Sequence, residues 1–283
     1  MALSPLRLKF NHHGRSHSLP STTHPAFSQF DENFKSSEPA SPSLLSLADT
    51  LNGLTILYCS IDDSLKLHHI QHIIAQECHE KWVDQVLDGY IQLLDACTAA
   101  KDLFSQTKHD IQELLSALRR KDVNGTHCYL TSRRKTKKMI QRSLKELRSC
   151  RNIRNNVVVR VEEDHETVAL VHMFKQAESA TISLIESLLS YVVGNKVQAR
   201  QSGWSFVSKL MQSKKASHQD EETDSNEFKK IDSFLQTSQE EDMQVMNHLK
   251  EMDSSIQTLE EELECLFKQL IRTRVFLLNI LNH

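Results

Sequence analysis

Histidines near position 70 are the first residues whose spacing could support chemistry. His68 and His72 are four residues apart and His69 and His72 are three apart, so on a helix two imidazoles could face one metal ion. Cys78 or His79 would lie near enough to supply a third ligand. Paired cysteines and a metalloprotease motif with a glutamate are both missing, however. The sequence therefore favours solvated or partly packed histidines, and we expect neither a bound metal nor a cofactor.

A run of cationic residues between positions 133 and 160 is the second candidate. A helix of this charge could bind phosphates of nucleic acid or of an anionic lipid surface. No aromatic side chain lies in the run, which argues against reading single strands by base stacking. The eleven basic residues, of which the first six are our candidate contacts, stand against one acid, Glu146: Arg133, Arg134, Lys135, Lys137, Lys138, Arg142, Lys145, Arg148, Arg151, Arg154 and Arg160.

An acidic run offers a structural alternative for the same cations. Two helices of opposite charge could lie side by side in a bundle and neutralise each other. The sequence leaves three alternatives open: polyanion binding, neutralisation within the fold, and a cationic face that is simply solvated. Between positions 240 and 264 there are nine acids and one lysine, Lys250: Glu240, Glu241, Asp242, Glu251, Asp253, Glu260, Glu261, Glu262 and Glu264.

The third candidate is a serine in the N-terminal tail. Arg15 lies three residues before Ser18 and Pro20 lies two after it, an arrangement that suits a basophilic kinase and then a phosphoserine-reading 14-3-3 protein. Ser4 and Ser41 each precede a proline and could be targets of proline-directed kinases. The alternative is a flexible tail that is not modified.

Catalytic patterns are missing from the chain. It has no glycine-rich phosphate loop and no nucleophile elbow. The Asp164-His165-Glu166 triplet fits a helix start, where acids lie favourably near the positive end of the helix dipole. We therefore expect a protein that is not an enzyme.

Composition indicates a mostly helical protein. Of 283 residues, 39% are hydrophobic, 25% are charged, 6% are aromatic and six are glycine, which leaves little of the turn chemistry and ring content that sheets need. The net charge of -3 argues against a dedicated nucleic-acid binder. No run reaches the length of a membrane span, and the nearest is 182–193.

Cysteine usage bears on the compartment. The six cysteines stand far apart without a CxxC pair, so we expect reduced thiols in the cytoplasm, with the nucleus or a membrane surface as alternatives. The first 30 residues carry cations and no acid, which also suits a plastid or mitochondrial transit peptide.

Proline placement predicts the domain organisation. All five prolines fall within the first 42 residues, so 1–42 should be a disordered Ser/His/Pro-rich tail and 43–283 a helical bundle domain. The polar stretch at about 195–226 should be a mobile linker within that domain.

The element that organises the bundle is a long amphipathic helix predicted over 78–121. Large apolar residues recur there every three or four positions, for example at Trp82, Leu93 and Phe104. Such a helix is longer than a compact core needs, so other helices must lie along it. We predict an all-α, elongated antiparallel bundle of long helices.

The remaining helices follow from capping residues and periodicity. We expect them at 44–66, 68–76 and 127–159, then from Asp164 to Gly194, with turn residues at 122–125. From Glu227 to Leu281 we expect one long helix or two collinear ones.

A heptad pattern runs through the last helix. The seam could pair with the long helix of the same chain, which we favour, or with a second molecule in a homodimer. The seam residues are spaced by four and three positions, and all except Thr273 are apolar: Met252, Ile256, Leu259, Leu263, Leu266, Leu270, Thr273, Leu277 and Ile280.

Several ordered blocks resemble a plant-specific helical family of unknown function related to the BYPASS proteins. The blocks are 15–21 with His24-Pro25, 82–88 leading into 94–97, 116–120, and 266–275 with 277–281. The family has no established catalytic residues. The resemblance implies a role in root and shoot development through control of a mobile signal. We expect an interaction protein whose bundle surface contacts a protein partner.

Overall fold

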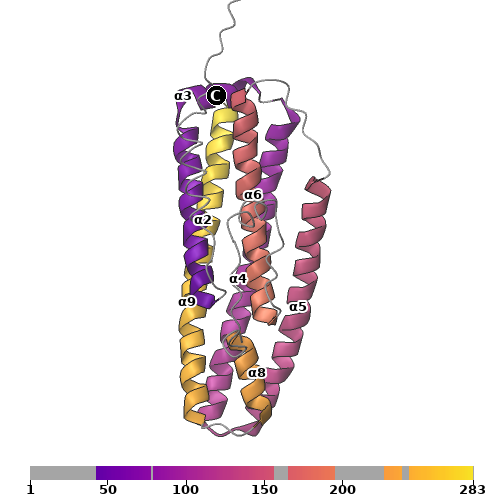
Figure 1. The fold of residues 1–283 in the computed structure, drawn as a ribbon, viewed down its shortest axis with the longest axis vertical. Coiled ribbons are helices and arrows are strands. Elements are labelled where there is room, and N and C mark those ends of the chain that lie inside the picture. The colour runs from indigo at the N-terminus through magenta and orange to yellow at the C-terminus, as the bar shows by residue number, and fades with distance from the viewer. Residues whose placement is uncertain (1–42, 78, 156–164, 195–225, 238–241, 283) are drawn as a thin grey trace, which may run out of the picture.

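The structure is a computed structural model that describes residues 43–77, 79–155, 165–194, 226–237 and 242–282. Within these ranges the chain forms helices and no strand, and the long helices lie side by side in an elongated bundle (Figure 1). The predicted all-α bundle is confirmed. The helices are α2 (Leu44–Leu65), α3 (His68–Gln76), α4 (Lys81–Arg119), α5 (Val123–Asn155), α6 (His165–Val193), α8 (Glu227–Thr237) and α9 (Asp242–Leu281).

Helix α4 is the long central helix that the periodicity predicts. Its 39 residues span about 58 Å at 1.5 Å per residue. Tyr90, Cys97 and Phe104 follow one another at intervals of seven residues, so they lie on one stripe of the helix. All three are buried against other helices. The helix begins at Lys81, where the Trp82 indole N–H donates to the Glu77 carboxylate at 2.9 Å.

Helix α9 packs its heptad seam against α2 and α4 of the same chain. All nine seam residues are buried, including Thr273, whose hydroxyl donates to the Gln269 carbonyl at 3.0 Å. Lys108 pairs with Glu260 and, one turn later in α4, Gln112 donates to Asp253. Numbers rise in α4 as they fall in α9, so these two helices are antiparallel.

Helix α2 is apolar enough to raise a membrane question. Among the described residues it is the one helix long enough and apolar enough, by length and composition, to cross a membrane. Its apolar stripe is buried in the bundle, and a core helix has the same composition. The stretch 182–193, which the sequence ranked nearest to a span, is part of α6 and does not meet that criterion.

The turn between α4 and α5 is tighter than predicted. Lys121 has a φ of 55°, and the Asp122 amide donates back to the Ala117 carbonyl, which closes α4. The Asp122 carboxylate accepts from the Asn124 amide at 3.0 Å, as a helix N-cap does. Helix α5 therefore begins at Val123 rather than at 127, and Gly125 lies inside its first turns.

Helices α8 and α9 are not collinear, contrary to the prediction. The rings of Phe234 and His248 lie 6.4 Å apart between their centroids. Fourteen residues along one continuous helix would separate them by about 21 Å. The two helices therefore lie side by side here rather than end to end, and Figure 1 shows α8 near α5 at the lower end of the bundle.

Some predictions fall outside the described residues. These are the tail 1–42 with Arg15, Ser18 and Pro20, the cap Asp164, the stretch 195–225 and the thiol of Cys78.

Candidate polyanion-binding surface

Helix α5, which carries the cationic run, does not lie beside the acidic helix. It packs against α4 and α6, whereas α9 packs against α2 and α4 (Figure 1). The acids of α9 pair instead with α4, where Lys101 contacts Glu264 and Lys108 contacts Glu260. The alternative that α9 neutralises the cationic run is therefore wrong, because the partner of α9 is set by its apolar seam.

The inner face of α5 fixes which side of the helix meets solvent. Tyr129, Ile140 and Leu144 are buried against the neighbouring helices. The buried carboxylate of Asp110 in α4 accepts from the Ser132 hydroxyl at 2.8 Å and from Thr136 at 3.5 Å. These contacts prevent the helix from rotating and turn the opposite side outward.

The outward side of α5 carries a cluster of cations that we name the α5 cationic face. Arg134, Lys138, Arg142 and Lys145 are spaced by four or three residues and so form one stripe. From the first to the last member the face spans about 21 Å along the helix axis. One exposed acid, Glu146, lies among them. The face consists of six exposed side chains: Arg134, Lys135, Lys138, Arg142, Lys145 and Arg148.

Arg133, the first of the predicted contacts, lies inside the protein. It is 3% exposed, and one guanidinium nitrogen donates to the Val192 carbonyl at the end of α6. Its Nε lies 3.6 Å from an Asp232 oxygen, and its guanidinium carbon lies 4.6 Å from the centre of the Phe228 ring. A cation is well placed at the negative end of a helix dipole. Arg133 therefore joins α5 to α6 and α8 and does not belong to the exposed face.

Lys137 is neither fully exposed like the α5 cationic face nor buried like Arg133. Its side chain is 32% exposed, and its Nζ lies 2.7 Å from the other carboxylate oxygen of Asp232. Asp232 thus contacts two cations of α5 from helix α8.

The sequence reading missed two kinds of residue. Lys145 and Arg148 share the face with the candidate contacts, and helical spacing alone could have added them. Phe228 and Asp232 were assigned to one long C-terminal element, and the signal that could have separated α8 is the apolar spacing of Phe228, Ile231 and Leu235. The side chains of Arg151, Arg154 and Arg160 lie outside the described part.

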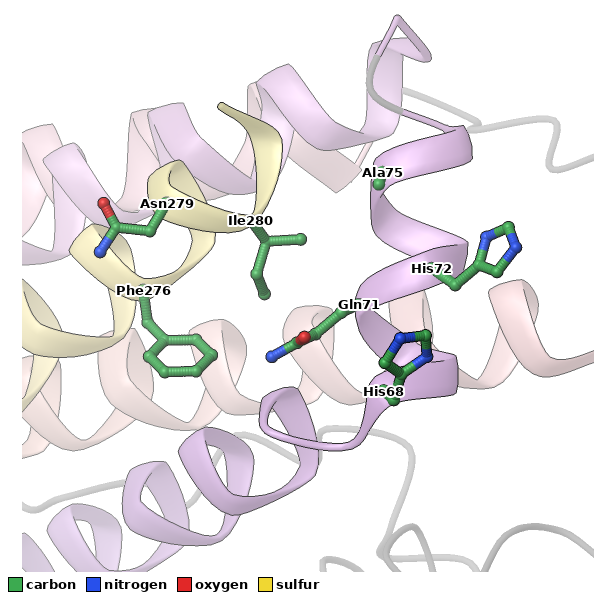
Figure 2. Close-up of a pocket in the computed structure, with 7 residues that line it drawn as sticks. All are labelled: His68, Gln71, His72, Ala75, Phe276, Asn279 and Ile280. Carbon is green, nitrogen blue, oxygen red and sulfur yellow. The ribbon is translucent and has the colours of Figure 1, made fainter. Parts of the chain in front are cut away.

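The histidines lie on α3, at the end of the bundle opposite α8 (Figure 1). His68 and His72 line an open pocket of about 420 Å³ between α3 and the end of α9, with Phe276 and Ile280 across from them (Figure 2). In Figure 2 the His72 ring points away from α9. No group of three or more His, Cys, Asp or Glu side chains that could hold a metal occurs among the described residues.

These features define an all-α bundle protein that presents a charged helix surface. The chain belongs to the family described as Protein BPS1, whose family model matches residues 50–280. The match confirms the resemblance to a BYPASS-related plant family, and it includes the blocks in α4 and α9 but not the tail stretch 15–21. Comparison with curated proteins and with solved structures gave no match.

Proposed function

We propose that this chain is a non-enzymatic regulatory protein of plant development that acts by binding, and that its α5 cationic face docks on anionic membrane surfaces. Membership of the Protein BPS1 family supports the developmental role. The missing catalytic patterns in the sequence favour a binding role. On this proposal the protein is cytoplasmic and reaches the membrane reversibly.

The observation that carries the proposal is the exposed, poorly matched charge of α5. Six exposed cations share the face with one acid, while the acids of α9 contact α4. Each Lys or Arg near an anionic bilayer contributes about 1 kcal/mol. Six such residues on one straight helix give enough attraction for a reversible peripheral contact.

A membrane fits this face better than a nucleic acid does. The whole chain has a net charge of -3, so a long polyanion that touches several sides of the bundle meets repulsion, whereas a flat surface meets α5 alone. No aromatic side chain in the cationic run could stack on a base. Met139, 48% exposed beside Lys138, adds an apolar contact suited to an interface.

The test is cosedimentation with vesicles of phosphatidylcholine alone or with added phosphatidylserine. We expect binding only to the anionic vesicles, weakening as salt rises. Reversing Arg134, Lys138 and Arg142 to Glu should weaken binding at least about a hundredfold. The matched control reverses the exposed Lys175, Lys250 and Lys268.

Three results would contradict the membrane proposal. The first is equal binding by the face variant and the control variant, which carry the same net charge. The second is equal binding to neutral vesicles. The third is preference for duplex DNA over anionic vesicles at matched phosphate concentration, which would assign the face to nucleic acid.

A second candidate function is supported by the tail sequence. Arg15, Ser18 and Pro20 have the spacing of a phosphoserine site read by 14-3-3 proteins, so the tail would receive the signal that regulates the bundle. The test is a pull-down from plant extract with wild type beside Ser18→Ala, analysed by mass spectrometry. Loss of a phosphate-reading protein from the variant is the expected result, and identical captures would reject this candidate.

A further inference from the structure

Helix α8 holds a carboxylate against two cations at the edge of the α5 cationic face. We propose that α8 competes with the anionic membrane for the cations of α5. In the free protein Asp232 pairs with Lys137 and Arg133, and membrane binding displaces α8 so that both cations can contact the membrane. This inference rests on the proposed function, because it describes how the same face is regulated. The Asp232 carboxylate of α8 takes the place that a lipid phosphate would have beside these cations.

The contacts of Asp232 show that its carboxylate lies where a lipid phosphate would bind the two cations. Its Oδ2 lies 2.7 Å from the Lys137 ammonium, and its Oδ1 lies 3.6 Å from Arg133 Nε. Lys137 and Arg133 are one helical turn apart, so one carboxylate bridges both. Arg134 and Lys138, the next residues along α5, are exposed. The bridged pair is therefore continuous with the open face.

The pairing leaves hydrogen-bonding capacity unused. Among the described residues, Nε and Nη1 of Arg133 are buried without a hydrogen-bond partner, and so is Oδ1 of Asp232. A buried polar group without a partner destabilises the arrangement that holds it. A phosphate group has more acceptor oxygens than a carboxylate and can satisfy more of these donors. A surface rich in phosphates can therefore replace Asp232 as the partner of these two cations.

The attachment of α8 is also small. The helix has 11 residues, too few to be stable alone in water. Phe228 and Ile231 are its fully buried side chains. Asn226 caps its first turn through the Phe228 amide and donates to the Tyr191 carbonyl of α6. Helix α8 contacts α5 through the Asp232 pair and through the Phe228 ring, which lies beside the Arg133 guanidinium, so loss of the Asp232 pair weakens this contact and favours release.

The first test compares variants for binding to phosphatidylserine vesicles. Asp232→Asn should bind about fivefold more tightly than wild type, the effect of one freed cation. Phe228→Ala removes an anchor of α8 without changing charge and should tighten binding in the same direction. Glu227→Gln removes an acid of the same helix that is not paired with α5, and should change binding less than twofold. Circular dichroism checks that each variant is folded.

The second test follows α8 directly by hydrogen exchange. In wild-type protein, the amides of 227–237 should exchange faster when anionic vesicles are bound, while those of α5 become protected. Unchanged or slower exchange in α8 on binding would overturn the inference. So would equal tightening by Asp232→Asn and Glu227→Gln with none by Phe228→Ala, because charge alone would then explain the effect.

The outcomes also separate this inference from the proposed function. If wild type and Asp232→Asn both fail to bind anionic vesicles, the membrane proposal itself is wrong. If wild type binds and the α8 variants behave like it, the surface is correct and the competition is rejected. Ile231→Ala provides a second charge-neutral variant should Phe228→Ala not fold.

Discussion

Lys108 of α4 and Glu260 of α9 form an ion pair whose Nζ and Oε2 atoms lie 3.0 Å apart, with only 21% and 22% of the two side chains exposed. The neighbouring pair Lys101 and Glu264 repeats the contact two turns earlier in α4 and one turn later in α9, and the Lys101 hydrogen bond lowers the pKa of Glu264. Glu260 and Glu264 of α9 thus pair with α4 rather than with α5, which leaves the exposed cations of α5 available for another anion.

Charge reversal should reveal this pairing as coupling energy. Lys108→Glu and Glu260→Lys should each destabilise the protein, and the double variant should recover about 1 kcal/mol of the summed loss. Urea denaturation of the four proteins gives the cycle. As a control, Lys138→Glu on α5 should show no coupling to Glu260→Lys. Coupling to Lys138 instead would mean that α9 lies beside α5.

A glycine in the first turns of α5 marks a close approach to α4. A Cβ added at Gly125 would lie 2.3 Å from the Cβ of Ala117, closer than two methyl carbons can approach. Gly125→Ala should therefore lower the free energy of unfolding by about 1 to 3 kcal/mol, although alanine is the better helix former. Thermal and urea denaturation measure the loss. Adding Ala117→Gly should restore part of it, and a stabilised Gly125→Ala protein would contradict the close packing.

Two buried tyrosines in contact should respond differently to loss of the hydroxyl group. Tyr58 and Tyr90 pack edge to face, 6.0 Å between ring centres. Tyr58 hydrogen bonds at 2.9 Å with Thr181, which itself donates to the Ala177 carbonyl, so Tyr58 is the donor. The buried Tyr90 hydroxyl has no hydrogen-bond partner within the part of the chain that the structure describes. Tyr58→Phe should cost about 1 kcal/mol and Tyr90→Phe should be neutral or stabilising.

Denaturant titration of both tyrosine variants measures this difference. A cost at Tyr90 as large as that at Tyr58 would mean that an ordered water serves the Tyr90 hydroxyl.

A buried thiol should make stability depend on alkaline pH. Burial raises the pKa of Cys97 from its ordinary value of 9.0 to about 12. Above pH 9 the unfolded chain releases a proton that the folded protein keeps, so stability falls as pH rises. Between pH 9 and 10, Cys97→Ala should remove up to about 1.4 kcal/mol per pH unit of that fall. Replacing the exposed Cys128 by Ala should leave the slope unchanged, and an unchanged slope in Cys97→Ala would refute a buried thiol.

Local patterns in the sequence determined the helices. The repeat of apolar residues predicted α2 and α4 nearly to their ends, because a helix buries one stripe and the stripe recurs every three or four residues. The heptad seam of α9 likewise identified its buried residues, such as Leu263 and Leu270. The start of α5 was predicted four residues too late, because Lys121 adopts the left-handed conformation that glycine usually supplies and so gives no turn signal in the sequence.

The heptad seam favoured pairing of α9 with α4 in the same chain, which the structure confirms, but the neighbours of α5 came only from the tertiary structure. Opposite charge suggested that α9 would lie against α5, yet ion pairs are weak beside apolar burial, and the seam of α9 fits α2 and α4. The same packing buried Arg133 and left Arg134 exposed, although the two are adjacent in the chain. A sequence records that cations are present, but the rotation of α5 against α4 and α6 decides which of them meet solvent.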